Sequence, residues 1–424
     1  MNVFLLIIVI ILMIAQNYRS EDVESPLPTW NIEDSYPLCK QYHYDRGTWH
    51  EKNTLLSTPE GSRELYRHYA LLGPGKALHW DYVWLPDNCS YHRFTSRTVN
   101  HFLDKLRHSS KGSNFPREDV EIVVIGDSGI RGILCGLGRL LNGSEIYGPN
   151  DNLICGGSTG TPISMDNVSD FYSVQLTPHF KMTFRYIFGL NKNVNNSFDE
   201  FFMPNLLYEY VRDHRPYAFF LCTGIWDFEY LWKYHNYTHN WLEDSCITPE
   251  AKEVAELRAS PAILDFFRNM SSLARTTDTR LIYRTNHLNY RYPAQCADSI
   301  LLERLLKQQE GPEYQRVDPA VFPHLLRPWE IWDNYAITNS SLVREFYIDF
   351  SFHYDRIPIH TVADHENLYI SHPTLKHCGT LETQLTQLFL NTLFYPEILK
   401  AFERKEEFVS SFINGQTKTN SMVC

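Results

Sequence analysis

One serine stands where the sequence predicts that a strand turns into a helix. Residues 120–125 form a short β-branched apolar run, Gly126-Asp127-Ser128-Gly129 follows, and apolar residues then recur at helical spacing as far as residue 141. The free N–H groups at the start of a helix favour developing negative charge. Ser128 could therefore attack a carbonyl while its own N–H holds the oxyanion. The alternative from these residues alone is a serine that caps the helix beside a solvated Asp127.

The surrounding elements predict an α/β fold. We expect buried strands over residues 120–125, 218–222 and 281–283, and helices over 201–211, 262–273, 300–306 and 381–393. Such alternation is typical of a mainly parallel sheet with helices on both faces. In these sheets the chemistry lies beyond the carboxyl ends of the strands. Ser128, Gly224 and Arg284 all fall at such ends.

Two motifs together resemble the PC-esterase branch of the SGNH (GDSL-type) hydrolases. Trp84-Leu-Pro-Asp-Asn-Cys89 comes first, and Val-Val-Ile-Gly-Asp-Ser-Gly-Ile-Arg follows and ends at Arg131. This branch includes the plant trichome-birefringence-like proteins and the animal neurexophilin-and-PC-esterase-domain proteins. The resemblance runs from about Trp84 to Leu393. It implies a three-layer α/β/α fold and acyl-ester chemistry, often O-acetyl transfer or hydrolysis on glycans.

The resemblance also implies roles for single residues. Ser128 matches the nucleophile, and Gly224 matches a glycine whose N–H contributes to the oxyanion hole. Gly157, or its neighbour Gly156, is the candidate for a second oxyanion N–H. Trp226 stands where many SGNH hydrolases have an oxyanion asparagine, and the PC-esterase branch often has an aromatic residue there.

Arg284 belongs to a second element that is similar to the plant proteins. Tyr283-Arg284-Thr285 matches their aromatic-Arg-Thr element, and this similarity implies a side chain that lines the cleft. A structural salt bridge is an equally good account of the arginine.

The proton relay departs from the family pattern. The family has Asp-x-x-His shortly before the last helix, with the histidine as general base and the aspartate as its orienting partner. Here His372-Pro373 occupies the histidine position, but Tyr369 stands where the aspartate is expected. We expect His372 to act as the base, with Asp364 as the substitute acid. The other candidates nearby are Glu366 as the acid and His365 or His377 as the base.

The N-terminus predicts export. An apolar run over residues 3–15 is too short for a membrane span of about 20 residues and fits a signal peptide. No basic residue precedes the run, so an uncleaved anchor is the alternative. Acceptor triplets for N-glycosylation are spread along the chain, at Asn88, Asn142, Asn167, Asn195, Asn236, Asn269 and Asn339. We therefore expect a glycoprotein that is secreted or resides in the lumen of the secretory pathway, such as the Golgi.

The nine cysteines fit an oxidising compartment. Most are expected in disulfides whose pairing the sequence does not give, while Cys135 and Cys222 lie in apolar segments that suit buried thiols. No Cys-x-x-Cys pair occurs, so structural zinc is not predicted. No metal and no cofactor are expected.

The net charge and the composition along the chain predict its partners and its division into segments. The 424 residues carry a formal net charge of −11, which argues against a nucleic-acid partner. The expected partner is a carbohydrate or glycoprotein substrate, with an acyl donor if the reaction is a transfer. The predicted division is a signal peptide or anchor (1–20), an irregular, disulfide-containing cap (21–116), an SGNH/PC-esterase-like domain (117–402) and a polar tail (403–424). No membrane domain is expected beyond the N-terminal segment.

Overall fold

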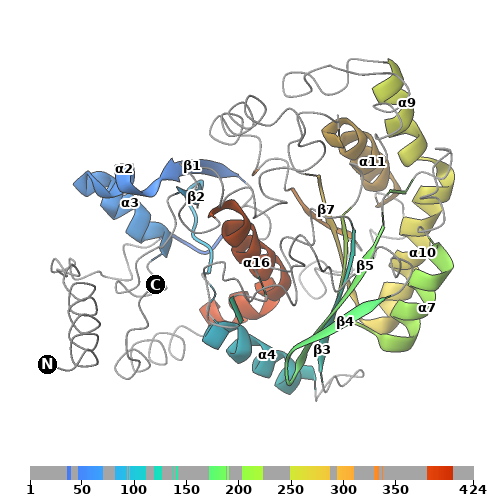
Figure 1. Cartoon of the computed structure of the whole chain (residues 1–424), viewed down its shortest axis with the longest axis horizontal. Helices are drawn as coiled ribbons and strands as arrows, with labels where there is room; N and C mark the ends of the chain where they lie inside the picture. The colour runs from blue at the N-terminus through green and yellow to red at the C-terminus, as the bar shows by residue number, and fades with distance from the viewer. Residues whose placement is uncertain are drawn as a thin grey trace, which may run out of the picture.

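A six-stranded sheet forms the centre of the computed structural model (Figure 1). The structure describes residues 36–39, 46–69, 82–92, 94, 96–110, 119–126, 137, 140–141, 171–187, 189–190, 203–222, 249–286, 294–309, 329–333, 337 and 380–403. The strands of the sheet are β3 (Val120–Gly126), β4 (Tyr172–Thr177), β5 (Phe180–Tyr186), β6 (Ala218–Cys222), β7 (Arg280–Arg284) and β8 (Trp329–Trp332).

The spatial order of these strands is β4-β5-β3-β6-β7-β8. Neighbouring strands are parallel except for β4 and β5, which form an antiparallel pair. The five parallel strands therefore lie in the order second, first, third, fourth, fifth along the chain. This is one of the two common doubly wound orders, and the order reverses between β3 and β6.

Alternate residues of the central strands face two separate cores. In β3, Ile122 and Val124 join one hydrophobic cluster, while Val123 and Ile125 join the other. Every residue of this strand is buried. A continuous apolar run suits a strand with both faces covered, whereas an alternating run would expose one face. The predicted central strand is therefore confirmed.

Helices cover both faces of the sheet (Figure 1). On one side lie α7 (Pro204–His214), α10 (Pro261–Thr277) and α11 (Ala294–Gln309), with α9 (Pro249–Arg258) packed against α11. On the other side lie α4 (Ser96–Ser110) and α16 (Thr380–Glu403). In the helix α10 the local sequence sets both ends and the buried face. Pro261 begins the helix, Asp278 ends it in a left-handed conformation, and buried residues recur every three or four positions between them.

The N-terminal region has its own small sheet. The strand β1 (Gly47–Glu51) pairs antiparallel with β2 (Tyr82–Pro86), next to α2 (Lys52–Leu56) and α3 (Pro59–Tyr69). A disulfide joins Cys39 to Cys89. The indole N–H of Trp49 donates to the carbonyl of Ile337, 2.8 Å away. This region belongs to the same hydrophobic cluster as α4, α16 and one face of the large sheet.

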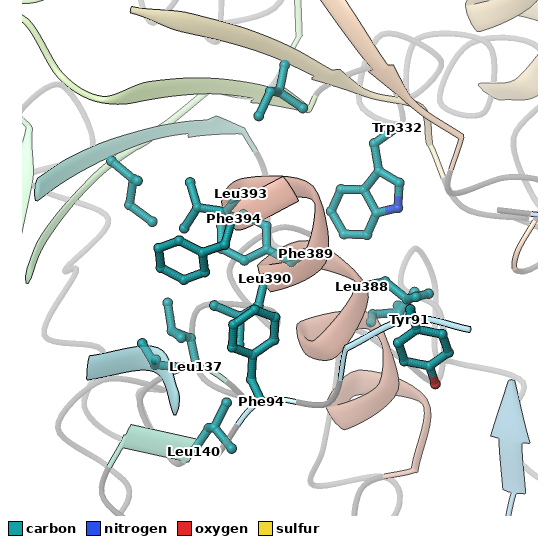
Figure 2. Packing of buried hydrophobic residues seen from close by; sticks show 14 of the residues in the cluster. Tyr91, Phe94, Leu137, Leu140, Trp332, Leu388, Phe389, Leu390, Leu393 and Phe394 are labelled. Carbon is teal, nitrogen blue, oxygen red and sulfur yellow. The ribbon is translucent and has the colours of Figure 1, made fainter. Parts of the chain in front are cut away.

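The helix α16 also holds an extended segment by side-chain hydrogen bonds to its backbone. Gln387 accepts from the N–H of Phe94 at 2.6 Å and donates to its carbonyl at 2.9 Å. Asn391 does the same at His92, with distances of 2.8 and 2.6 Å. Figure 2 shows Phe94 among the apolar side chains of α16. These amides thus satisfy buried peptide groups that have no strand partner there.

The structure confirms the α/β class, the mainly parallel sheet and a disulfide in the N-terminal region. It confirms Cys222 as a buried thiol, whereas Cys135 lies outside the described residues. It adds elements that the sequence did not predict, chiefly β4, β5, β8 and the helices of the N-terminal region. Within the described part, none of the helices combines the length and apolar character needed to cross a membrane.

Candidate functional site

Four neighbouring strands end in one row at the carboxyl edge of the sheet. Gly126 of β3 pairs with Cys222 of β6, and Arg284 of β7 pairs with Trp332 of β8. Leu221 pairs with Tyr283, so Cys222 and Arg284 are also neighbours across their strands. The row includes the point between β3 and β6 where the strand order reverses, and doubly wound sheets bind their ligands outside such a point.

The side chains of this row lie on the face that α16 covers. Cys222 and Trp332 belong to the same hydrophobic cluster as Phe389 of α16, whose ring centroid lies 6.1 Å from that of Trp332. Figure 2 shows Trp332 at the rim of this cluster, with its indole nitrogen turned away from Phe389. The alternation of β7 directs Arg284 to this face as well, because Ile282 of the same strand belongs to that cluster.

Arg284 is a buried cation with polarisable neighbours. Its side chain is 1% exposed, one guanidinium nitrogen lies 3.2 Å from the sulfur of Cys222, and its centre lies 5.3 Å from the Trp332 ring centroid. A guanidinium over an indole ring gains a cation–π interaction. Within the described residues Arg284 forms no ion pair with a carboxylate. Its partners within the described residues are instead the Cys222 sulfur and the Trp332 ring.

A buried network on the opposite face holds the turn after β7. Arg258 donates to Asp298 at 3.0 Å and to the hydroxyl of Tyr283 at 2.7 Å, and that hydroxyl donates to Asp298 at 2.5 Å. The other oxygen of Asp298 accepts from the backbone and side chain of Asn286. Burial raises the pKa of Tyr283 well above its ordinary value, so its hydroxyl stays protonated and remains a donor.

The same turn is tied to the end of β8. The N–H of Thr285 donates to the carbonyl of Trp332 at 3.0 Å, and its hydroxyl donates to Asp333 at 3.1 Å. Together with the Asp298 contacts, these bonds fix the backbone on the carboxyl side of Arg284. Arg284, the last residue of β7, is thus followed by a turn that is held by hydrogen bonds, as a positioned binding group requires.

Most of the residues that the sequence predicted for the site lie outside the described residues. These are Ser128, His372, Asp364, Gly224, Gly157 and Trp226. Arg284 is described, at the carboxyl edge of the sheet where the sequence predicted it. Gly126 and Cys222, which are also described, end the two strands that precede Ser128 and Gly224 in the sequence.

The sequence did not predict that Trp332 lies at the carboxyl edge of the sheet. It also did not predict that Arg258 and Asp298 form an ion pair next to Tyr283. The run Trp-Glu-Ile-Trp over residues 329–332 is a short apolar strand signal that could have identified the fifth parallel strand. No local pattern marks Arg258 and Asp298, because they are 40 residues apart and meet only through packing. Among the described side chains, no group of three or more His, Cys, Asp or Glu could hold a metal ion.

No protein-family model matches this chain, and comparisons with curated proteins and with solved structures find no significant match either.

Proposed function

We propose that the chain is an SGNH-like acyl-ester hydrolase or acyltransferase of the secretory pathway, which acts on O-acyl groups of glycans through a Ser128 acyl-enzyme. The proposal rests on the resemblance of the Trp84–Cys89 and Gly-Asp-Ser motifs to the PC-esterase branch. Its expected fold is a three-layer α/β/α sandwich. The observed α/β class, with helices on both faces of a mainly parallel sheet, agrees with that expectation.

The observation that carries the proposal is the pairing of Gly126 with Cys222 at the point where the strand order reverses. Ser128 follows Gly126 by two residues, and Gly224 follows Cys222 by two residues. The chain segments that carry the nucleophile and the oxyanion donor therefore leave adjacent strands at the same edge. A nucleophile and an oxyanion N–H must act on one carbonyl group, so this adjacency is what the chemistry needs.

In the proposed reaction, the Ser128 hydroxyl attacks the ester carbonyl while His372 accepts its proton. The N–H groups of Ser128 and Gly224 stabilise the oxyanion, and His372 returns the proton to the leaving alcohol. Water then attacks the acyl-enzyme in a hydrolase, and a sugar hydroxyl does so in a transferase. Asp364 is the proposed partner that orients His372.

The direct test is turnover of O-acetylated glycans and of a small activated acetyl ester by the full chain and by Ser128→Ala. The proposal predicts that the variant loses turnover while its melting temperature stays within about 1 °C, since the removal of one hydroxyl group usually changes stability little. Gly129→Ala, one residue further on, serves as a neighbour that changes the turn without removing the hydroxyl. Full turnover by Ser128→Ala would rule out the mechanism.

A second candidate is a non-catalytic extracellular binding protein with the same fold. The observation that favours it is Tyr369, which stands where the family has the aspartate of the relay. This candidate predicts glycan binding that persists in Ser128→Ala, together with no turnover of any ester by the unaltered chain.

A further inference from the structure

We infer that the carboxyl edge of the sheet binds an oxyanion, most simply a ligand carboxylate, between Arg284 and Trp332. Two buried donors at this edge lack a hydrogen-bond acceptor within the described structure: the Nε–H of Arg284 and the Nε1–H of Trp332. Neither residue's side chain can accept a hydrogen bond. They end adjacent strands in register, and the guanidinium centre lies 5.3 Å from the indole ring centroid.

Two arginines close to Arg284 in the fold differ from it, because each has a carboxylate partner within the described residues. Arg258 has Asp298 as its carboxylate at 3.0 Å, and Arg280 has Glu330 at 2.7 Å. Arg284 instead donates to the thiol of Cys222, which is a weak acceptor. A fully buried guanidinium is costly unless an anion is paired with it.

The position of the two donors indicates that the anion comes from a ligand. They end β7 and β8 at the carboxyl edge of the sheet, and doubly wound sheets bind ligands outside the carboxyl ends of their strands. The turn that carries Arg284 is held by Asp298 and by Thr285, so the donor does not need to reorganise on binding. A guanidinium fork matches the two oxygens of a carboxylate, and an indole N–H can add a third hydrogen bond.

The first test is a thermal-shift titration of the full chain with sodium acetate, in Hepes buffer at an ionic strength held constant with sodium chloride. Acetate at about 100 times its Kd should raise the melting temperature by about 3 °C. A parallel titration with sodium sulfate separates carboxylates from tetrahedral oxyanions. A response to sulfate instead of acetate would keep the site and assign it to sulfate or phosphate groups.

Arg284→Gln gives the decisive comparison. Without added anion, this variant should be at least as stable as the wild type, because it removes a buried charge that lacks a carboxylate. In acetate the order should reverse, because only the wild type is stabilised. The matched control is Arg268→Gln, which removes one exposed charge from α10 and should keep the full acetate response. Equal destabilisation of Arg284→Gln in both buffers would overturn the inference, since a group of the protein would then be the counter-ion.

Trp332→Phe tests the second donor. It keeps an aromatic ring in the cluster but removes the N–H together with part of the buried indole, so the affinity for acetate should fall at least about tenfold, which corresponds to about 1.4 kcal/mol. An unchanged affinity would exclude the indole from the site. The inference does not depend on Ser128 as a nucleophile: Ser128→Ala should keep the acetate response, so failure of the anion site and failure of the proposed reaction can be told apart.

Discussion

One buried histidine, His92, should make a measurable contribution to the pH dependence of stability. His92 lies between α4 and α16, with its ring 4.7 Å from that of Phe94 and 5.5 Å from that of Phe102. Burial, with a smaller contribution from His101, lowers the pKa of His92 from 6.5 to about 3. The unfolded chain therefore binds a proton at this residue at a pH where the folded chain does not.

The sign and size of the effect follow from this difference. Because the folded pKa lies below the unfolded value of about 6.5, the stability is complete above that pH and falls as the pH drops toward about 3. Between pH 7.5 and pH 5 the loss is about 2 kcal/mol. At pH 5 this loss hardly changes for any folded pKa below about 4, since the folded histidine is then neutral in every case.

The assay is urea unfolding at pH 7.5, 6.5, 5.5 and 5.0 for the wild type, His92→Phe and His92→Gln. Both variants keep the backbone groups that Asn391 binds, and neither can take up the proton. Each should lose about 2 kcal/mol less than the wild type between the highest and lowest pH. A pH dependence identical to that of the wild type in both variants would refute the reasoning, because His92 would then titrate alike in both states.

Three further predictions concern the contacts that hold the fold. Asp298→Ala should lower the free energy of unfolding by about 3 to 5 kcal/mol, since it leaves the charge of Arg258 buried, whereas Asp265→Ala on the exposed face of α10 should change it by less than about 1 kcal/mol. Gln387→Ala should lower the free energy of unfolding, measured in urea, by about 2 to 4 kcal/mol, because both peptide groups of Phe94 lose their partner. A decrease below about 0.5 kcal/mol would contradict a stabilising role for these two hydrogen bonds. Loss of the Cys39–Cys89 disulfide, which closes a loop with a sequence separation of 50, should cost about 4 kcal/mol; Cys39→Ala with Cys89→Ala measured against the oxidised chain checks this.

The sequence predicted the strands that are apolar on both faces and the helices with a clear apolar stripe. The strands over 120–125, 218–222 and 281–283 are continuous or nearly continuous apolar runs, and they became β3, β6 and β7. The strand β5 was missed because the polar residues Lys181 and Thr183 interrupt its apolar residues. Both are compensated by Glu121 on the neighbouring strand, at 3.0 and 2.5 Å. That compensation depends on the register of two strands about 60 residues apart in sequence, which no local pattern encodes.

The candidate site could likewise be predicted only in part, because some of its contacts depend on strand pairing. The sequence placed Arg284 at the end of a strand because Leu-Ile-Tyr precedes it, and the structure confirms that position. Its surroundings could not be predicted, since the thiol of Cys222 and the indole of Trp332 reach it only through the pairing of β6, β7 and β8. The helix α9 escaped prediction for a related reason: it is largely polar, and its packing against α11 supplies the stability that its own pattern does not indicate.

The most direct measurement for the proposed function is the reaction of the full chain with a fluorophosphonate, followed by intact-mass analysis and peptide mapping. The proposal predicts one adduct, on Ser128, which is absent in Ser128→Ala and strongly reduced in His372→Ala, because an activated serine attacks this reagent. A folded, unlabelled wild type, or an adduct on Ser128 that forms equally fast in His372→Ala, would contradict a Ser128–His372 catalytic pair.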